Sequence, residues 1–166
     1  MLKSAIRKSS TFMKIMAQPK NKIKPQNFKF FLVLDFEANC QKGQRLDPQE
    51  IIEFPCLLVE SETFKIVSTF HEYIKPVGVP GLTPFCTELT GITQDMVDTK
   101  KTFPDILEKF QVWYGENSLT LENSSFVTCG LWDLVDMLPK QCKYSGQGKL
   151  KENKLLKNFG YRYRCP

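Results

Sequence analysis

Residues 31–40 read FLVLDFEANC, an apolar run that ends in two acidic residues one position apart. The nearly continuous apolar character of residues 28–34 predicts a strand that is buried on both faces. Because alternate side chains of a strand point to the same face, Asp35 and Glu37 share one side while Phe36 points to the other. Paired carboxylates beside an apolar run are unfavourable unless a cation lies between them, and hard oxygen donors suit Mg²⁺ or Mn²⁺. The motif indicates either a metal site or a strand that simply leaves the core for solvent.

The composition fits one globular domain. The chain has 166 residues, of which 42% are hydrophobic and 25% are charged, enough apolar material for a core. No stretch reaches the roughly 18 to 20 consecutive apolar residues of a membrane-spanning helix, so we expect no membrane role. The six cysteines form no CxxC pair, and no apolar secretory signal precedes them. We therefore expect reduced thiols in an intracellular protein, in the cytoplasm or nucleus, rather than a disulfide framework or a zinc ribbon.

The net charge of +5 is unevenly distributed. Residues 1–34 contain eight Lys or Arg and no acid, and residues 139–166 contain eight basic residues and one acid. Between them, residues 35–138 contain seven basic and seventeen acidic residues. Basic tails are weak indicators of nucleic-acid binding, because charge runs are often solvated. The acidic middle suits a cation-binding site.

The composition divides the chain into three parts. Residues 1–27 form a basic, acid-free extension that is typical of either a mitochondrial presequence or a disordered tail. Residues 28–144 contain the apolar patterns of a folded domain. Residues 145–166 form a Lys-rich tail with no clear place in a core.

The domain alternates between strand and helix patterns. Residues 51–59 and 64–74 read as two further strands joined by a hairpin. Residues 103–114 carry apolar residues every three or four positions, as an amphipathic helix does. Residues 126–129 predict a fourth strand, and residues 132–138 a second helix. This order predicts a mixed α/β fold.

Four blocks of sequence resemble a known enzyme family. They are FLVLDFEANC at 31–40, PQEIIEFPCLLV at 48–59, LTPFCTELTGITQDMVD at 82–98 and FVTCGLWDLVDMLPKQC at 126–142. In order and spacing they are similar to the ERI family of DEDDh 3′-to-5′ exoribonucleases, and among these to the prion-protein-interacting branch. The resemblance implies an RNase H-like mixed sheet flanked by helices. It also implies single-stranded RNA 3′ ends as substrate, while DNA and a protein partner stay open.

The resemblance implies a two-metal site with Mg²⁺ or Mn²⁺. Asp35, Glu37 and Asp133 match the first two acidic blocks of the family, as catalytic residues and metal ligands. Asp35 would touch both ions, Glu37 would hold the ion that activates water, and Asp133 would support the site from the start of a helix. Taken alone, Asp133 could equally be an acid that interacts with the dipole of that helix.

The segment TELTGI at 87–92 resembles the family's loop that packs against terminal bases. The resemblance implies apolar contacts from Leu89 and Ile92, with Thr90 near the sugar. The alternative is the end of a short helix capped by Gly91, with its neighbours buried.

Three further residues complete the expected substrate contacts. Phe36 and Ala38 flank Glu37 in the first block, and Trp132 precedes Asp133. Trp132 would flank the terminal nucleotide, although a tryptophan at the start of a helix also commonly belongs to a core.

The family's third block, which places a His a few residues before a final Asp, has no match here. The single histidine, His71, lies on an expected strand, where a structural role is the expectation. The match fades after Tyr144, which predicts a C-terminally truncated domain with impaired activity. A catalytically inactive form that binds nucleic acid or protein is the alternative.

Overall fold

The computed structural model describes residues 27–146. The expected extension at residues 1–27 and the Lys-rich tail at residues 145–166 lie almost wholly outside these residues. No helix in the described range is long and apolar enough to cross a membrane. The five cysteines of this range are free thiols.

The described residues form a mixed sheet, as predicted, and it has five strands, of which β2 was not expected. Its longest strand, β3 (Ile51–Glu60), pairs antiparallel with β1 (Phe30–Leu34), β2 (Glu37–Ala38) and β4 (Ile66–Tyr73). The strand β5 (Ser124–Val127) pairs with β1 in parallel. Because β1 and β5 run in the same direction, their carboxyl ends meet at one edge of the sheet.

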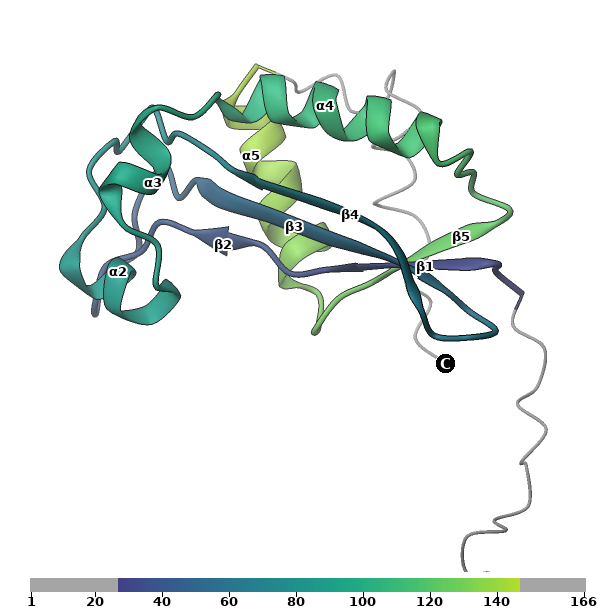
Figure 1. Ribbon diagram of the computed structural model, residues 1–166. Coiled ribbons are helices and arrows are strands. Elements are labelled where there is room, and N and C mark those ends of the chain that lie inside the picture. The colour runs from purple at the N-terminus through teal and green to yellow at the C-terminus, as the bar shows by residue number, and fades with distance from the viewer. Residues whose placement is uncertain (1–26, 147–166) are drawn as a thin grey trace, which may run out of the picture.

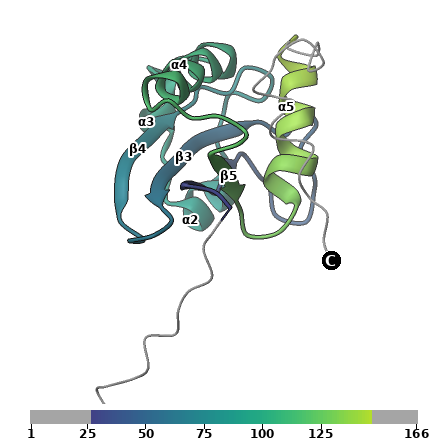
Figure 2. The ribbon, with the colours of Figure 1, turned by 90° about the vertical axis from the view of Figure 1, so that its right-hand side faces the viewer.

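Helices cover one face of the sheet. The amphipathic pattern of residues 103–114 forms α4 (Phe103–Glu116), which runs along the upper side of the sheet in Figure 1. Its Phe110 stacks on Phe54 of β3 with ring centroids 4.7 Å apart. The helical segment after β5 consists of a π-helix, η1 (Trp132–Met137), and α5 (Leu138–Tyr144). Figure 2 shows α5 beside the sheet, and its buried residues join the same hydrophobic core as those of α4.

Two short helices complete the described fold. The helices α2 (Pro84–Thr90) and α3 (Gln94–Asp98) bury Cys86, Ile92 and Val97 against Ile52 of β3. Gly91 ends α2 with a left-handed φ of 75°, which confirms the helix-cap interpretation of this segment.

The prediction that the first strand is buried on both faces is wrong. In β1, Leu32 and Leu34 are 0% and 2% exposed, whereas Val33 between them is 39% exposed. In Figure 1, α4 lies above the sheet and α2 lies below its left-hand end. The strand β1 thus has one face under α4 and one open face, on which Val33 is exposed.

Candidate active site

Asp35 lies in the short link from β1 to β2 and Glu37 begins β2, so the two acids flank a buried aromatic residue. Phe36 is 3% exposed, and its ring contacts the edge of Phe54 with centroids 4.8 Å apart. Asp35 is exposed and Glu37 is half-buried. The alternation expected from a strand is thus present, because the core holds Phe36 and leaves the two carboxylates on the open side.

Asp133 reaches the same edge of the sheet from η1. It is 1% exposed, and its Oδ1 accepts a hydrogen bond of 2.8 Å from the backbone N–H of Phe36. This bond ties the start of η1 to the peptide between Asp35 and Glu37. The sequence prediction that these three residues converge is consistent with this contact.

The turn after β5 sets where η1 begins. Gly130 has a φ of 92°, a conformation that side-chain-bearing residues rarely adopt, and its carbonyl accepts a hydrogen bond of 2.7 Å from the Thr128 hydroxyl. At the other end, the N–H of Leu138 bonds to the carbonyl of Asp133, the wide spacing of a π-helix. Pro139 follows in the first turn of α5, where its missing N–H is tolerated, so the helical segment continues beyond the predicted residues 132–138.

The three carboxylates act on one another electrostatically. Burial raises the pKa of Glu37, and the charges of Asp35, Glu53 and Asp133 raise it further. Burial also raises the pKa of Asp133, while the Phe36 N–H opposes this shift and the charge of Asp35 adds to it. Within residues 27–146, no Lys or Arg forms an ion pair with any of the three acids. This edge of the sheet therefore concentrates negative charge without a protein cation, which favours a bound metal ion.

The donor set fits Mg²⁺ or Mn²⁺ in its chemistry, because all three side chains offer hard oxygen ligands. Among the described residues, however, no group of three or more His, Cys, Asp or Glu side chains is already gathered into a metal-binding cluster. The Oδ1 atom of Asp133 is engaged by Phe36, so this side chain is fixed. Binding of one ion by all three acids would therefore need their oxygen atoms to move closer together.

The sequence did not single out Glu53, which belongs to the same cluster. Glu53 of β3 lies opposite Glu37 in the strand pairing and raises its pKa. The Nε2 atom of His71 on β4 lies 2.6 Å from Oε1 of Glu53. The expected structural role of His71 agrees with this exposed pair, and a cross-strand pattern between the blocks at 31–40 and 48–59 is the signal that could have revealed Glu53.

Of the three substrate contacts expected at residues 87–92, one side chain is exposed and two have structural roles. Leu89 is 65% exposed, as a base contact requires. The Thr90 hydroxyl donates to the carbonyl of Cys86 at 2.8 Å and accepts from the N–H of Ile92 at 3.1 Å. Ile92 is 2% exposed, so the prediction that its side chain contacts a base is wrong. The turn at Gly91 returns the chain to the core, which explains this burial.

Trp132 is 38% exposed, so the interpretation as a core residue is wrong and a surface role is open to it. Phe36 and Ala38 are 3% and 6% exposed, and their side chains belong to the core. These two residues could reach a substrate only through their backbone, and their expected substrate contact stays a prediction.

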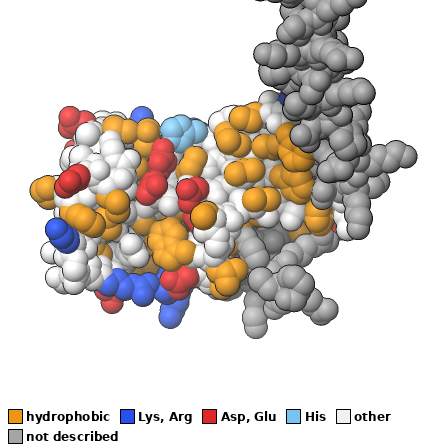
Figure 3. Space-filling model, turned by 90° about the horizontal axis from the view of Figure 1, so that it is seen from below, with side chains coloured by type: hydrophobic (Ala, Val, Ile, Leu, Met, Phe, Trp, Pro, Cys, Tyr) orange, Lys and Arg blue, Asp and Glu red, His pale blue; other side chains and the backbone are white. Residues whose placement is uncertain are grey.

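The open face of the sheet combines charge with apolar surface. Figure 3 shows acidic side chains gathered in the middle of this face, with hydrophobic side chains beside them. Exposed apolar residues of the strands on this side include Val33 and Val127, at 39% and 43%.

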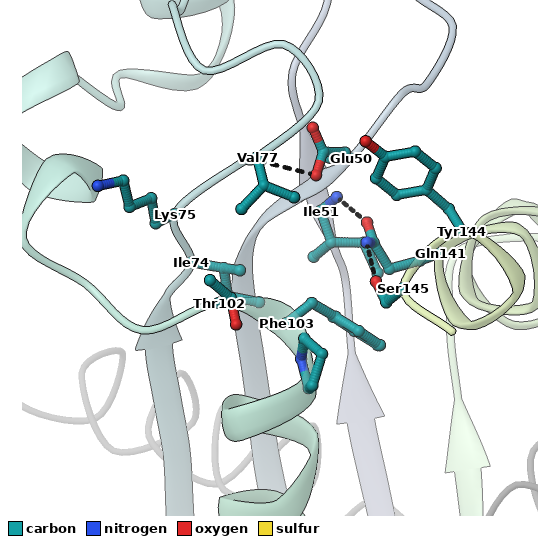
Figure 4. A pocket seen from close by; sticks show the side chains of 11 residues that line it. Glu50, Ile51, Ile74, Lys75, Val77, Thr102, Phe103, Gln141, Tyr144 and Ser145 are labelled. Carbon is teal, nitrogen blue, oxygen red and sulfur yellow. Dashed lines mark hydrogen bonds between the residues drawn. The ribbon is translucent and has the colours of Figure 1, made fainter. Parts of the chain in front are cut away.

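A separate pocket of about 350 Å³ lies where β3, α4 and α5 meet, and Figure 4 shows its lining. Its buried Glu50 accepts hydrogen bonds of 3.0, 2.8 and 3.1 Å from three consecutive backbone N–H groups at residues 77–79. Its buried Gln141 accepts from the N–H of Ile51 at 2.8 Å and donates to the Ser145 hydroxyl at 2.9 Å. The side chains of Glu50 and Gln141 are thus occupied by hydrogen bonds to neighbouring segments, and the pocket is distinct from the acidic edge.

Comparison with known proteins agrees with the acidic edge. The RNase_T family model, described as an exonuclease, matches residues 32–164. The chain belongs to this exonuclease family. It is 55% identical over 124 residues to human ERI1 exoribonuclease 3, a match that covers 74% of this chain and 36% of the human protein. It is 38% identical over 146 residues to human 3′-5′ exoribonuclease 1, covering 84% of this chain and 42% of that protein.

Solved structures place this exonuclease-family chain in the RNase H-like fold, as expected. The nuclease domain of 3′hExo, a DEDDh family member bound to rAMP, superposes with a TM-score of 0.67 at 39% identity, covering 72% of this chain and 60% of that one. A structure of 3′-end recognition of the histone mRNA stem-loop by 3′-exonuclease gives a TM-score of 0.70 at 36% identity, covering 87% and 50%. The chain spans less than half the length of the relatives ERI1 exoribonuclease 3 and 3′-5′ exoribonuclease 1.

Proposed function

We propose that this chain carries a metal-dependent 3′-to-5′ exonuclease site that acts on the 3′ ends of single-stranded RNA. The observation that carries the proposal is the hydrogen bond of 2.8 Å from Phe36 to Asp133, which fixes the acid after β5 beside Asp35 and Glu37. The names of the relatives, which are exoribonucleases, support RNA as the substrate.

The three acids would hold the metal. A bound divalent pair polarises a phosphodiester, lowers the pKa of the attacking water and stabilises the leaving oxygen. Asp133 contributes a fixed position, because burial and the Phe36 N–H leave it one orientation. The accumulated negative charge at Glu37 and Asp133 raises their affinity for a cation.

Two exposed apolar side chains, one near the end of α2 and one at the start of η1, are suited to hold the terminal nucleotides. Leu89 and Trp132 are 65% and 38% exposed. Unstacked bases commonly pack on such side chains, which hold a single strand without reading its sequence. In this proposal, Leu89 and Trp132 contact bases while the backbone around Phe36 positions the last phosphate.

The test combines metal binding with the direction of cleavage. Calorimetric titration with Mn²⁺ should show binding to the wild type and to Asp95→Asn, an exposed control acid on α3, but not to Asp35→Asn. With protein in excess over a 5′-labelled 12-nucleotide RNA, Mg²⁺ or Mn²⁺ should produce a ladder that shortens from the 3′ end. EDTA and Asp35→Asn should both abolish the ladder.

Internal cuts, or a ladder that persists in Asp35→Asn, would contradict the assignment. Metal-independent RNA binding without any shortening would favour the alternative of an inactive binding form, for which the structure offers no observation of its own.

A further inference from the structure

Two cations from different parts of the fold share one carboxylate on the helical segment that carries Asp133. Arg45, in the loop before β3, places its Nη2 3.6 Å from Oδ2 of Asp136 on η1. Lys140 of α5 forms an ion pair with the other oxygen of Asp136. The side chains of Arg45 and Lys140 are 63% and 50% exposed, so both stay open to solvent. The hydrogen bond from Lys140 lowers the pKa of Asp136, and the group retains one net positive charge.

Two further lysines extend this positive group. Lys42 lies in the same loop as Arg45, in a turn closed by the bridge between Gln41 and Gln44. Lys143 is exposed and follows Lys140 by three positions on α5, so the two are neighbours on the helix surface. We call Lys42, Arg45, Lys140 and Lys143 the basic ridge.

The acids around the basic ridge do not neutralise it. Asp136 is shared by two cations, and Asp47 is the exposed acid of the same loop. The carboxylate of Glu50, where this loop enters β3, is taken up by three backbone N–H groups. Counted together, the four cations of the ridge and the three acids Asp47, Glu50 and Asp136 leave one net positive charge.

The basic ridge starts close to the acidic edge. Asp133 and Lys140 lie on one continuous helical segment, and their separation along it is about 10 Å at the usual helical rise. Figure 3 shows basic side chains along one margin of the face whose middle holds the acids, with hydrophobic side chains between the two groups. A stacked strand advances about 3.4 Å per nucleotide, so this distance corresponds to roughly two or three nucleotides.

We propose that the basic ridge binds phosphates of the RNA strand two to three nucleotides upstream of the 3′ end held at the acids. The proposal rests on the proposed function, because it needs the 3′ end to lie at Asp35 and Asp133. Positive grooves that follow a phosphate backbone, next to side chains that stack on bases, are the usual means of holding a single strand. The ridge would set the direction in which the strand leaves the site.

The test compares two pairs of substitutions that remove the same charge from the full chain. Arg45→Gln/Lys140→Gln alters the ridge, and Lys100→Gln/Lys101→Gln alters two exposed lysines that follow α3. Binding of a 5′-labelled 12-nucleotide RNA is followed by fluorescence anisotropy in EDTA, which prevents cleavage, over a series of salt concentrations. The slope of log affinity against log salt should become shallower by about 1.4 in the ridge variant, from about 0.7 for each lost phosphate contact, and should change little in the control.

Further measurements separate the outcomes. A dinucleotide, with one phosphodiester, is too short to reach from the acids to the ridge, so its binding should not differ between the two variants. Lys42→Gln/Lys143→Gln breaks no observed ion pair and should also make the slope shallower. This second variant tests the ridge even if the first variant misfolds. A ridge variant whose slope equals that of the control would overturn the ridge and leave the proposed function standing. If the wild type did not bind the 12-nucleotide RNA, both the ridge and RNA as the substrate would fail.

Discussion

Two opposing effects act on the carboxylate of Asp133. Burial at 1% exposure disfavours its charge, while the Phe36 N–H at 2.8 Å requires an oxygen acceptor. The same side chain therefore has a structural task that does not depend on metal. A neutral isostere such as asparagine can accept the hydrogen bond from the Phe36 N–H, and alanine cannot.

We predict opposite effects for two substitutions of Asp133. Asp133→Ala leaves the buried N–H of Phe36 without an acceptor and should lower the free energy of unfolding by about 1 to 3 kcal/mol. Asp133→Asn retains an oxygen for that N–H and removes the charge, so its stability in EDTA should equal or exceed that of the wild type. Urea unfolding of the three proteins measures both effects. Equal destabilisation by the two substitutions would show that the charge, rather than the hydrogen bond, stabilises the fold.

Glu37 gives a pH-dependent prediction. Its pKa is raised by burial and by neighbouring acids, so the folded state favours the protonated form. Below the ordinary carboxyl pKa, Glu37 is neutral in both the folded and the unfolded chain. The stability of Glu37→Gln should there match that of the wild type. As the pH rises through the raised pKa the wild type loses stability that the variant keeps, so the variant should become the more stable protein at neutral pH.

Thermal unfolding in EDTA at acidic and neutral pH checks this sign. Mn²⁺ in place of EDTA should remove the stability difference between the wild type and Glu37→Gln, since a bound cation offsets the repulsion between the carboxylates. A stability difference that does not change with pH would contradict the electrostatic account of Glu37.

At the scale of elements, α4 is anchored to the sheet mainly through aromatic residues. Phe110 is 0% exposed, stacks on Phe54 at 4.7 Å and meets Phe70 edge-on at 5.1 Å. Phe110→Ala should therefore cost about 3 to 5 kcal/mol in the free energy of unfolding. Val112 lies on the same helix at 57% exposure, so Val112→Ala should cost far less. A small loss for Phe110→Ala would mean that the helix packs differently against the sheet.

The sequence predicted those elements whose pattern is long enough to repeat. The strands near residues 51–59 and 64–74 and the helix near residues 103–114 are confirmed with small changes at their ends. The helices α2 and α3 gave no periodic signal, because each spans too few residues for an amphipathic pattern. The strand β5 begins at Ser124, two positions before the expected start, since its register is set by pairing with β1 rather than by its own apolar residues.

The sequence indicated the acids of the candidate site better than it indicated the residues around them. The period of a strand placed Asp35 and Glu37 on one side, and the family resemblance supplied Asp133. Burial of Ile92 and exposure of Trp132 depend on how distant segments pack, which local patterns do not encode. Glu53 escaped notice because it joins Glu37 only through strand pairing.

Across the whole molecule, the two faces of the sheet differ in what they do. The covered face holds the aromatic core under α4, and the open face holds the acids, the pair of His71 with Glu53, and exposed valines. Of the three candidate acids, Asp35 and Glu37 therefore lie on the open side, and the buried Asp133 reaches them from η1. Four acids of this acidic middle, Asp35, Glu37, Glu53 and Asp133, act on one another electrostatically near the edge where β1 and β5 end.

The final prediction concerns the reaction rate of the 166-residue chain. Hydrolysis needs a group that takes a proton from the attacking water, and the chain's single histidine, His71, is paired with Glu53 at 2.6 Å on β4. Without a positioned base, the rate typically falls by on the order of 10² to 10⁴. We therefore expect this chain to shorten RNA from the 3′ end with Mg²⁺ or Mn²⁺, but at least about 100-fold more slowly than a family member with a positioned base.

The measurement follows the release of label from a 3′-labelled single-stranded RNA. Human 3′-5′ exoribonuclease 1 is the reference, and Asp35→Ala is the blank for contaminating nuclease. His71→Gln tests the one histidine directly: since its imidazole already serves Glu53, the slow rate should not change. If the wild-type chain matched the reference rate and His71→Gln abolished it, His71 would be the base and the pair with Glu53 would be part of the catalytic machinery. A reference-like rate that survived His71→Gln would mean that another group accepts the proton. Glu53 would be the first acid to examine, because it faces Glu37 across the strands.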